Sequence, residues 1–139
     1  MNPASDISVI IPLYNKAASI QRTLRSVMSQ RVQPREIIVV DDGSTDDSAQ
    51  LVQSLNSPLV RLLRQQNRGV SAARNRAMAE ATGRWVALLD GDDVWEEDYL
   101  QRVESLISAY PDCGAYGTGF WVEADGRRTM GDFPQQEGV

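Results

Sequence analysis

The chain has 139 residues, 42% of them hydrophobic, which is enough for one domain with a packed core and argues against general disorder. Its formal net charge of -5 is opposite to that of most nucleic-acid-binding proteins, so we expect no nucleic-acid partner. The chain has no histidine, which excludes Ser-His-Asp and Cys-His nucleophilic sites and histidine-rich zinc sites.

A single cysteine, Cys113, can form no intrachain disulfide and fits a reducing compartment. No apolar stretch reaches the ~20 residues that span a bilayer, and the N-terminus lacks the basic stretch and apolar core of a secretory signal. The sequence therefore predicts a cytoplasmic protein.

Strand and helix patterns alternate along the chain. The β-branched run 8–11, closed by Pro12, predicts the first strand, and apolar residues at helical spacing over 20–28 predict a helix. Residues 36–40 give the best strand pattern, and the polar turn 41–47 leads into a helix towards Leu55. Residues 60–63 predict a third strand, and the alanine-rich segment 70–81 predicts a helix that ends with Gly83 as its C-cap glycine.

Residues 85–89 predict a fourth strand, residues 99–110 a helix, and residues 115–122 a fifth strand. Such alternation requires crossover connections, so we expect an α/β fold of three layers (α/β/α) with a mostly parallel sheet. The near-continuous apolar strands agree, because parallel strands are covered on both faces. We expect a single domain over 1–139, and the polar end after Asp125 suggests that the domain is cut short.

Three polar clusters follow predicted strands, at residues 12–15, 41–46 and 90–93. Ligands of open parallel sheets bind at the carboxyl ends of strands, so we expect these clusters to converge on one edge. In the third cluster, Asp90, Asp92 and Asp93 repel one another, and a divalent cation with oxygen ligands would remove that cost. Gly91 would let the backbone turn tightly beneath it. The structural alternative is a solvated acidic turn that caps the next helix.

The second cluster, with Asp41 and Asp42, suits either an ordinary strand-to-helix turn or a carboxylate that binds a nucleobase or ribose. Arg74, on the helix that opens at Gly69, would counter a phosphate or, alternatively, pair with Asp41 or Asp42 to hold the scaffold. Tyr14 would lie against a base ring or simply pack at the strand end.

In order and spacing, these segments resemble family 2 glycosyltransferases with the GT-A fold. The resemblance covers roughly residues 6–110 and is carried by four segments: SVIIPLYNK at 8–16, IIVVDDGSTD at 37–46, NRG through ARN at 67–75, and LLDGDD at 88–93. It implies the Rossmann-like nucleotide-diphospho-sugar transferase fold and an enzyme that transfers a sugar from a nucleotide donor, usually UDP-linked.

The resemblance also implies residue roles. Pro12, Leu13 and Tyr14 would line the nucleotide pocket, and Asp42, or Asp41, would bind the base. Arg74 would support the nucleotide. The run Asp90-Gly91-Asp92 looks like the family's Asp-x-Asp motif, in which Asp92 would ligate Mg²⁺ or Mn²⁺, Asp90 would face the ribose or donor sugar, and Asp93 would be an alternative ligand.

The implied reaction inverts the anomeric carbon when an acceptor hydroxyl attacks it and a carboxylate base takes the proton. The acceptor would be a saccharide or a lipid-linked group in cell-envelope polysaccharide or glycolipid synthesis, with peripheral membrane association left open. Family members place the general base beyond the stretch that matches residues 115–125. Neither Glu123 nor Asp125 matches its motif, so we expect the base beyond Val139 and little transfer by this chain alone.

Two rival interpretations remain. An aspartate-dependent phosphotransferase or phosphatase needs a lysine or arginine further along the chain, but the only lysine, Lys16, precedes every acidic cluster. A non-catalytic nucleotide-sugar-binding module would keep the pocket without the base.

Overall fold

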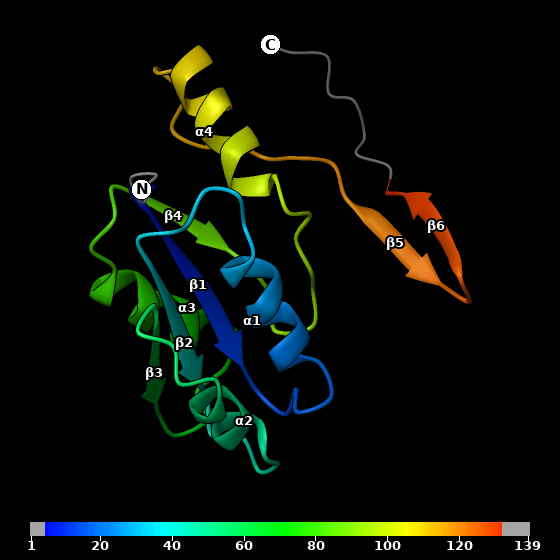
Figure 1. The fold of residues 1–139 in the computed structure, drawn as a ribbon. Coiled ribbons are helices and arrows are strands. Elements are labelled where there is room, and N and C mark those ends of the chain that lie inside the picture. The colour runs from blue at the N-terminus through cyan, green and yellow to red at the C-terminus, as the bar shows by residue number, and fades with distance from the viewer. Residues whose placement is uncertain (1–4, 132–139) are drawn as a thin grey trace. The chain divides into compact units, whose positions relative to one another are not determined.

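The computed structural model describes residues 5–131. Its centre is a four-stranded, all-parallel sheet in the order β3-β2-β1-β4 (Figure 1). The strands are β1 (Ile7–Leu13), β2 (Glu36–Asp41), β3 (Val60–Arg64) and β4 (Trp85–Leu88). The predicted parallel sheet is therefore confirmed, and each crossover carries the helix that the sequence predicts.

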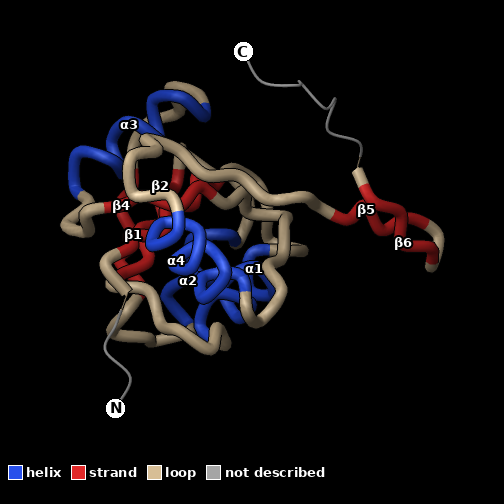
Figure 2. Tube along the Cα trace, turned by 90° about the horizontal axis from the view of Figure 1, so that it is seen from above, coloured by secondary structure: helices blue, strands red, loops and turns tan. Residues whose placement is uncertain are grey.

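Helices cover both faces of this sheet. Helices α1 (Ile20–Met28) and α2 (Ser48–Ser54) pack on one face, where Leu24 and Val27 join the buried cluster around Val9 and Ile11. Helix α3 (Val70–Glu80) packs on the other face through small side chains, Ala73 and Ala77 among them. Figure 2 shows the strands between α3 on one side and α1 and α2 on the other. These three layers explain why β1 and β2 read as apolar runs without alternation.

Strand β1 does not end before Pro12 as predicted but continues to Leu13. The Ile10 carbonyl accepts a hydrogen bond from the β4 side, and the Leu13 carbonyl accepts one from Asp42 on the β2 side. Residues of a strand alternate between their neighbours, so Pro12 faces the β4 side, where the pairing with β4 has already ended at Ile10. The missing N–H of proline therefore leaves no bond of the sheet unmade.

The predicted fifth strand is wrong in place and in partner. Residues 115–120 form no strand, and β5 (Trp121–Ala124) pairs antiparallel with β6 (Arg127–Met130) in a separate two-stranded sheet. The turn is Asp125-Gly126, both with positive φ, which is the turn chemistry that favours a two-residue hairpin. This hairpin belongs to the second of two compact units, which divide within helix α4 (Tyr99–Ala109), between Ser105 and Leu106. No helix of residues 5–131 is long and apolar enough to cross a membrane.

The C-cap role predicted for Gly83 is also wrong. The residue after α3, Ala81, is already extended, and the φ of Gly83 is not positive. Instead, a Cβ at Gly83 would lie 2.7 Å from the backbone nitrogen of Ser8. Glycine is needed here because the chain entering β4 passes directly against β1.

A buried carboxylate ties the amino ends of the strands together. Glu36, 8% exposed, accepts hydrogen bonds from the Ser8 hydroxyl, from the backbone N–H and hydroxyl of Thr82, and from Arg61. Burial alone would raise its pKa, but these donors outweigh burial and lower the pKa of Glu36 to about 2. One side chain thus joins β2 to β1, to β3 and to the turn before β4.

We predict that Glu36→Gln destabilises the protein at pH 7. A pKa of about 2, against 4.5 ordinarily, corresponds to about 3 kcal/mol of stability. Because the folded pKa is depressed, this stability is fully present above about pH 4.5 and is lost as the pH falls towards 2. Urea unfolding of wild type and variant across pH 2.5–7 should therefore show the two curves converging at low pH.

The matched control is Glu80→Gln, which removes the other carboxylate bound to Arg61. The Glu80 side chain is 49% exposed, so we expect a loss of less than about 1 kcal/mol. Equal losses in the two variants, or a difference between Glu36→Gln and wild type that does not shrink in acid, would contradict this assignment.

Candidate functional site

The loops after β1 and β2 are fastened together by Asn15. Its side-chain oxygen accepts hydrogen bonds from the backbone N–H of Thr45 at 2.8 Å, from the Thr45 hydroxyl and from the backbone N–H of Asp46. The backbone N–H of Asn15 donates to the Ser44 hydroxyl. Asn15 has φ +50°, a left-handed conformation that asparagine tolerates better than most residues. Asn15 makes its hydrogen bonds between the two loops from this left-handed conformation.

The loop after β4 joins the same edge. The Ser19 hydroxyl donates to the Gly91 carbonyl at 2.9 Å, and the Lys16 ammonium lies 2.6 Å from a carboxylate oxygen of Asp92. The expectation that the loops after the first, second and fourth strands converge at one edge of the sheet is confirmed.

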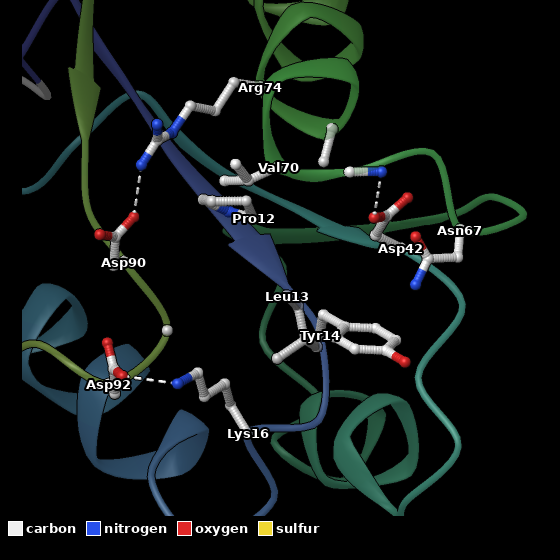
Figure 3. Close-up of a pocket in the computed structure, with 13 residues that line it drawn as sticks. Pro12, Leu13, Tyr14, Lys16, Asp42, Asn67, Val70, Arg74, Asp90 and Asp92 are labelled. Carbon is white, nitrogen blue, oxygen red and sulfur yellow. Dashed lines mark hydrogen bonds and ion pairs between the residues drawn. The ribbon is translucent and has the colours of Figure 1, made fainter.

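These loops and the start of α3 enclose a cavity of about 620 Å³ (Figure 3). Its lining comes from four segments: Pro12, Leu13, Tyr14 and Lys16; Asp42; Asn67, Gly69, Val70, Ala73 and Arg74; and Asp90, Gly91 and Asp92. Figure 3 shows Asp42, Asn67 and the Tyr14 ring towards one side of the cavity, with Arg74, Asp90, Asp92 and Lys16 towards the other. One side of the cavity therefore carries an aromatic ring, an amide and a single carboxylate, and the other side carries two carboxylates and two cations.

Asp42 holds the loop that leads into α3. Its carboxylate accepts hydrogen bonds of 2.8 Å from the Gln65 side chain and from the backbone N–H groups of Arg68 and Gly69. Burial would raise the pKa of Asp42, but these three donors outweigh it and lower the pKa below its usual range. Asp42 is therefore an ionised acceptor, and only Gly69 N–H binds its second oxygen within the described residues.

Asp41, proposed as an alternative to Asp42, lies elsewhere. It is completely buried, where Arg64 and the backbone N–H of Ser44 bind its carboxylate, and it is not among the residues that line the cavity. The idea that Arg74 pairs with Asp41 or Asp42 is wrong. Arg74 instead donates to Asp90 at 2.7 Å, and its buried Nε has no hydrogen-bond partner among residues 5–131.

The three carboxylates of residues 90–93 differ in their surroundings. Asp90 and Asp92 line the cavity, each paired with a cation, and the hydrogen bond and charge of Lys16 lower the pKa of Asp92. Asp93 is not in the lining, and desolvation together with the charges of Asp92 and Asp90 raises its pKa. Within residues 5–131, no three acidic or cysteine side chains are grouped closely enough to hold a metal by themselves.

The backbone turns tightly at Gly91 as predicted, since the Asp93 N–H donates to the Asp90 carbonyl at 3.1 Å, but the turn does not require glycine. Gly91 lines the cavity, but its φ is not positive, and a Cβ there would meet Lys16 and Pro12 only at an ordinary 3.5 Å. Glycine is required instead at Gly43, because its φ is +76° and a Cβ there would lie 2.9 Å from the backbone nitrogen of Asn67.

Sequence reasoning missed Lys16, Asn67, Val70 and Ala73 as lining residues. Lys16 precedes every acidic cluster in the sequence, yet the fold brings its ammonium against Asp92. Its position directly after the first strand was the available signal, because that is the edge at which the other polar residues were expected.

We predict that Asn15→Gly loosens the loop at residues 44–46, while Asn15→Asp preserves it. Glycine keeps the positive φ but loses the acceptor oxygen, whereas aspartate keeps an acceptor and tolerates this backbone conformation. We expect a loss of about 1 kcal/mol for Asn15→Gly and faster amide hydrogen exchange at Thr45 and Asp46. Exchange rates at these two amides that are the same in Asn15→Gly as in Asn15→Asp would refute the role of the side chain.

Comparison with curated proteins gives relatives that are glycosyltransferases or polysaccharide biosynthesis proteins. The uncharacterized glycosyltransferase YibD of Escherichia coli is 43% identical over 110 residues, which are 78% of this chain and 31% of YibD. The succinoglycan biosynthesis protein ExoO of Rhizobium meliloti is 38% identical over 109 residues, 74% of this chain and 31% of ExoO. The chain thus spans about a third of the length of these relatives.

Solved structures agree in fold. The structure of S. aureus TarS 1-349 in complex with UDP-GlcNAc matches with a TM-score of 0.70 and 31% identity, covering 80% of this chain and 32% of TarS. The mannosyltransferase PcManGT of Pyrobaculum calidifontis, in complex with GDP-Man and Mn²⁺, matches with a TM-score of 0.69 and 31% identity over 76% of this chain and 33% of that protein. These matches confirm the expected GT-A fold.

The family model described as glycosyl transferase family 2 matches residues 8–134. This range includes every segment that lines the cavity. With the relatives and the fold, it shows that this chain belongs to glycosyl transferase family 2.

Proposed function

We propose that the cavity binds a nucleotide-diphosphate sugar together with a divalent cation, and that the protein transfers the sugar to an acceptor hydroxyl. The observation that carries this proposal is the division of one cavity into a side with an aromatic ring, an amide and the Asp42 carboxylate, and a side with two cations and two carboxylates. A nucleoside diphosphate has the same two parts, a flat hydrogen-bonding base and a charged diphosphate. UDP-GlcNAc in TarS and GDP-Man in PcManGT are ligands of this kind.

The base would lie near Tyr14, Asp42 and Asn67. The Tyr14 side chain is half exposed at the cavity, so one ring face is available for stacking on a base. Asp42 is ionised and anchored, and its second oxygen would accept a base N–H. Uracil offers such a donor beside two carbonyls, which favours UDP. Pro12 and Leu13 would supply apolar contact, and Gly69 would let the ligand approach the start of α3.

The diphosphate would lie at the charged side. Three carboxylates (Asp42, Asp90, Asp92) and two cations (Lys16, Arg74) line the cavity, so a diphosphate would enter a site that is already negative. A divalent cation would change the net charge of the cavity lining from negative to positive. Mg²⁺ and Mn²⁺ are commonly held by one or two carboxylates plus substrate phosphates, so the residues fit such a cation although no three of them form a closed site in residues 5–131.

Asp92 would be the principal cation ligand, with Asp90 as a second ligand or a contact to the ribose or donor sugar, and Asp93 as an alternative. When bound there, Mg²⁺ or Mn²⁺ would supply positive charge to offset the charge of a departing diphosphate. Arg74 would hold Asp90 in place and direct its guanidinium to the nucleotide side. The acceptor hydroxyl would attack the anomeric carbon from the face opposite the diphosphate, inverting it.

We further propose a saccharide or lipid-linked acceptor in cell-envelope polysaccharide or glycolipid synthesis, because one relative is a succinoglycan biosynthesis protein. A cytoplasmic location, where nucleotide sugars are made, suits this role. A module that binds nucleotide sugar without transferring it would show the same ligand binding but no turnover.

We predict that Tyr14→Ala weakens UDP binding about tenfold, because base stacking on an aromatic ring contributes about 1–3 kcal/mol. Tyr14→Phe keeps the ring and should bind UDP nearly as wild type does. Calorimetric titration of both variants provides the measurement. Equal weakening by alanine and phenylalanine would show that the hydroxyl, and not the ring, contacts the ligand.

We predict that Asp92→Asn makes UDP binding at least tenfold weaker in the presence of Mn²⁺ and removes its dependence on the metal. The control is Asp47→Asn, which removes the same charge from an exposed residue that is not in the cavity lining. Calorimetry with and without Mn²⁺ compares the two. Metal-independent binding of inorganic phosphate, with no preference for a nucleotide, would support an aspartate-dependent phosphatase instead.

A further inference from the structure

The contact between Lys16 and Asp92 places a built-in cation on the carboxylate that we propose as the principal metal ligand. The ammonium lies 2.6 Å from the Asp92 Oδ2 atom, and both side chains line the cavity. Figure 3 shows the lysine side chain extending from the loop after β1 to meet Asp92. A divalent cation bound to this carboxylate would lie within a few ångströms of the ammonium, and repulsion between the two positive charges would drive the ammonium away.

The displacement costs little. The two side chains are 42% and 48% exposed, and ion pairs in such positions are weak. Only the lysine side chain need move, since the backbone of Lys16 is fixed separately by its N–H bond to the Ser48 hydroxyl at 2.8 Å. The four-carbon stem can therefore swing while the loop stays in place.

The displaced ammonium is exposed enough for water to solvate it, and a new negative partner in the cavity would bind it in place of water. Asp90 is already bound to Arg74, Asp42 is bound to Gln65 and two backbone N–H groups, and Asp93 is not in the cavity lining. A diphosphate beside the cation offers several oxygens within the same cavity, and lysine binds phosphate as a point charge that adapts to many positions.

Resting on the proposed function, we propose that Lys16 is an exchangeable counter-ion: it neutralises Asp92 before the metal binds and transfers to the donor's diphosphate when the metal takes Asp92. This exchange makes Lys16 a weak competitor of the metal in the free protein and a ligand of the nucleotide in the loaded one. It also couples the two binding events, because the metal releases the group that the diphosphate then uses.

The test is Lys16→Met, which keeps the length of the stem and removes the charge. We expect the affinity for Mn²⁺ without nucleotide to rise roughly two- to fivefold, as the loss of an exposed ion pair allows. We expect the affinity for UDP at saturating Mn²⁺ to fall several-fold. Free Mn²⁺ is counted by electron paramagnetic resonance and UDP binding is measured by calorimetry, so neither readout requires turnover.

Two controls separate this exchange from general effects. Lys16→Arg keeps the positive charge and should leave both affinities near wild type. Arg25→Met removes one charge from an exposed position of α1 that does not line the cavity, so it reports the effect of net charge alone.

Opposite changes in the two affinities for Lys16→Met, absent in Arg25→Met, support the exchange. Any other combination of changes in the Mn²⁺ and UDP affinities overturns the proposed exchange. A lysine with only a structural role would change both affinities in the same direction. If wild type binds Mn²⁺ through Asp92 but Lys16→Met binds it no more tightly, only this inference is wrong. If neither protein binds Mn²⁺, both this inference and the proposed metal site are wrong.

Discussion

The cavity depends on the hydrogen bonds that Asn15 makes across two loops. A parallel sheet brings the loops after β1 and β2 to the same edge, but it does not fix their shape, because loop backbone outside the sheet has no partner that the sheet dictates. Asn15 supplies partners to Thr45 and Asp46 from a backbone conformation that most residues avoid. The loop carrying Tyr14 and Lys16 is thereby fixed relative to the loop carrying Asp42.

Polar networks lie at both ends of the strands, but they differ in burial and in the number of hydrogen bonds that each carboxylate accepts. Glu36 sits at the amino ends, buried and saturated with donors, where its charge is stabilised and joins three strands and a turn. Asp90 and Asp92 sit at the carboxyl ends, exposed, each in an ion pair with one cation. The difference is physical: a buried, fully bonded carboxylate resists exchange, whereas an exposed ion pair is weak and exchanges readily.

The two sides of the cavity are positioned by different parts of the fold. Asp42 and Asn67 belong to the loop contacts that Gly43 makes possible by its close approach to Asn67. Arg74 comes from the first turns of α3, whose small residues Ala73 and Ala77 let the helix lie close to β1 and β2. The same packing that covers the sheet thus brings the arginine within reach of Asp90 after β4.

The parallel sheet, its helices and the edge at which the polar loops gather could be predicted from the sequence, because apolar runs and helical spacing are local patterns and strand direction fixes where strands end. The Asp-x-Asp motif and the preference for Asp42 over Asp41 came instead from the resemblance to family 2 glycosyltransferases. The pairing of charges, as in Arg74 with Asp90 and Lys16 with Asp92, could not be predicted, since residues 16 and 92 meet only through strand order. The tertiary structure also excluded Asp41 from the cavity and assigned residues 121–130 to a hairpin, because burial and strand partners depend on packing that no short segment encodes.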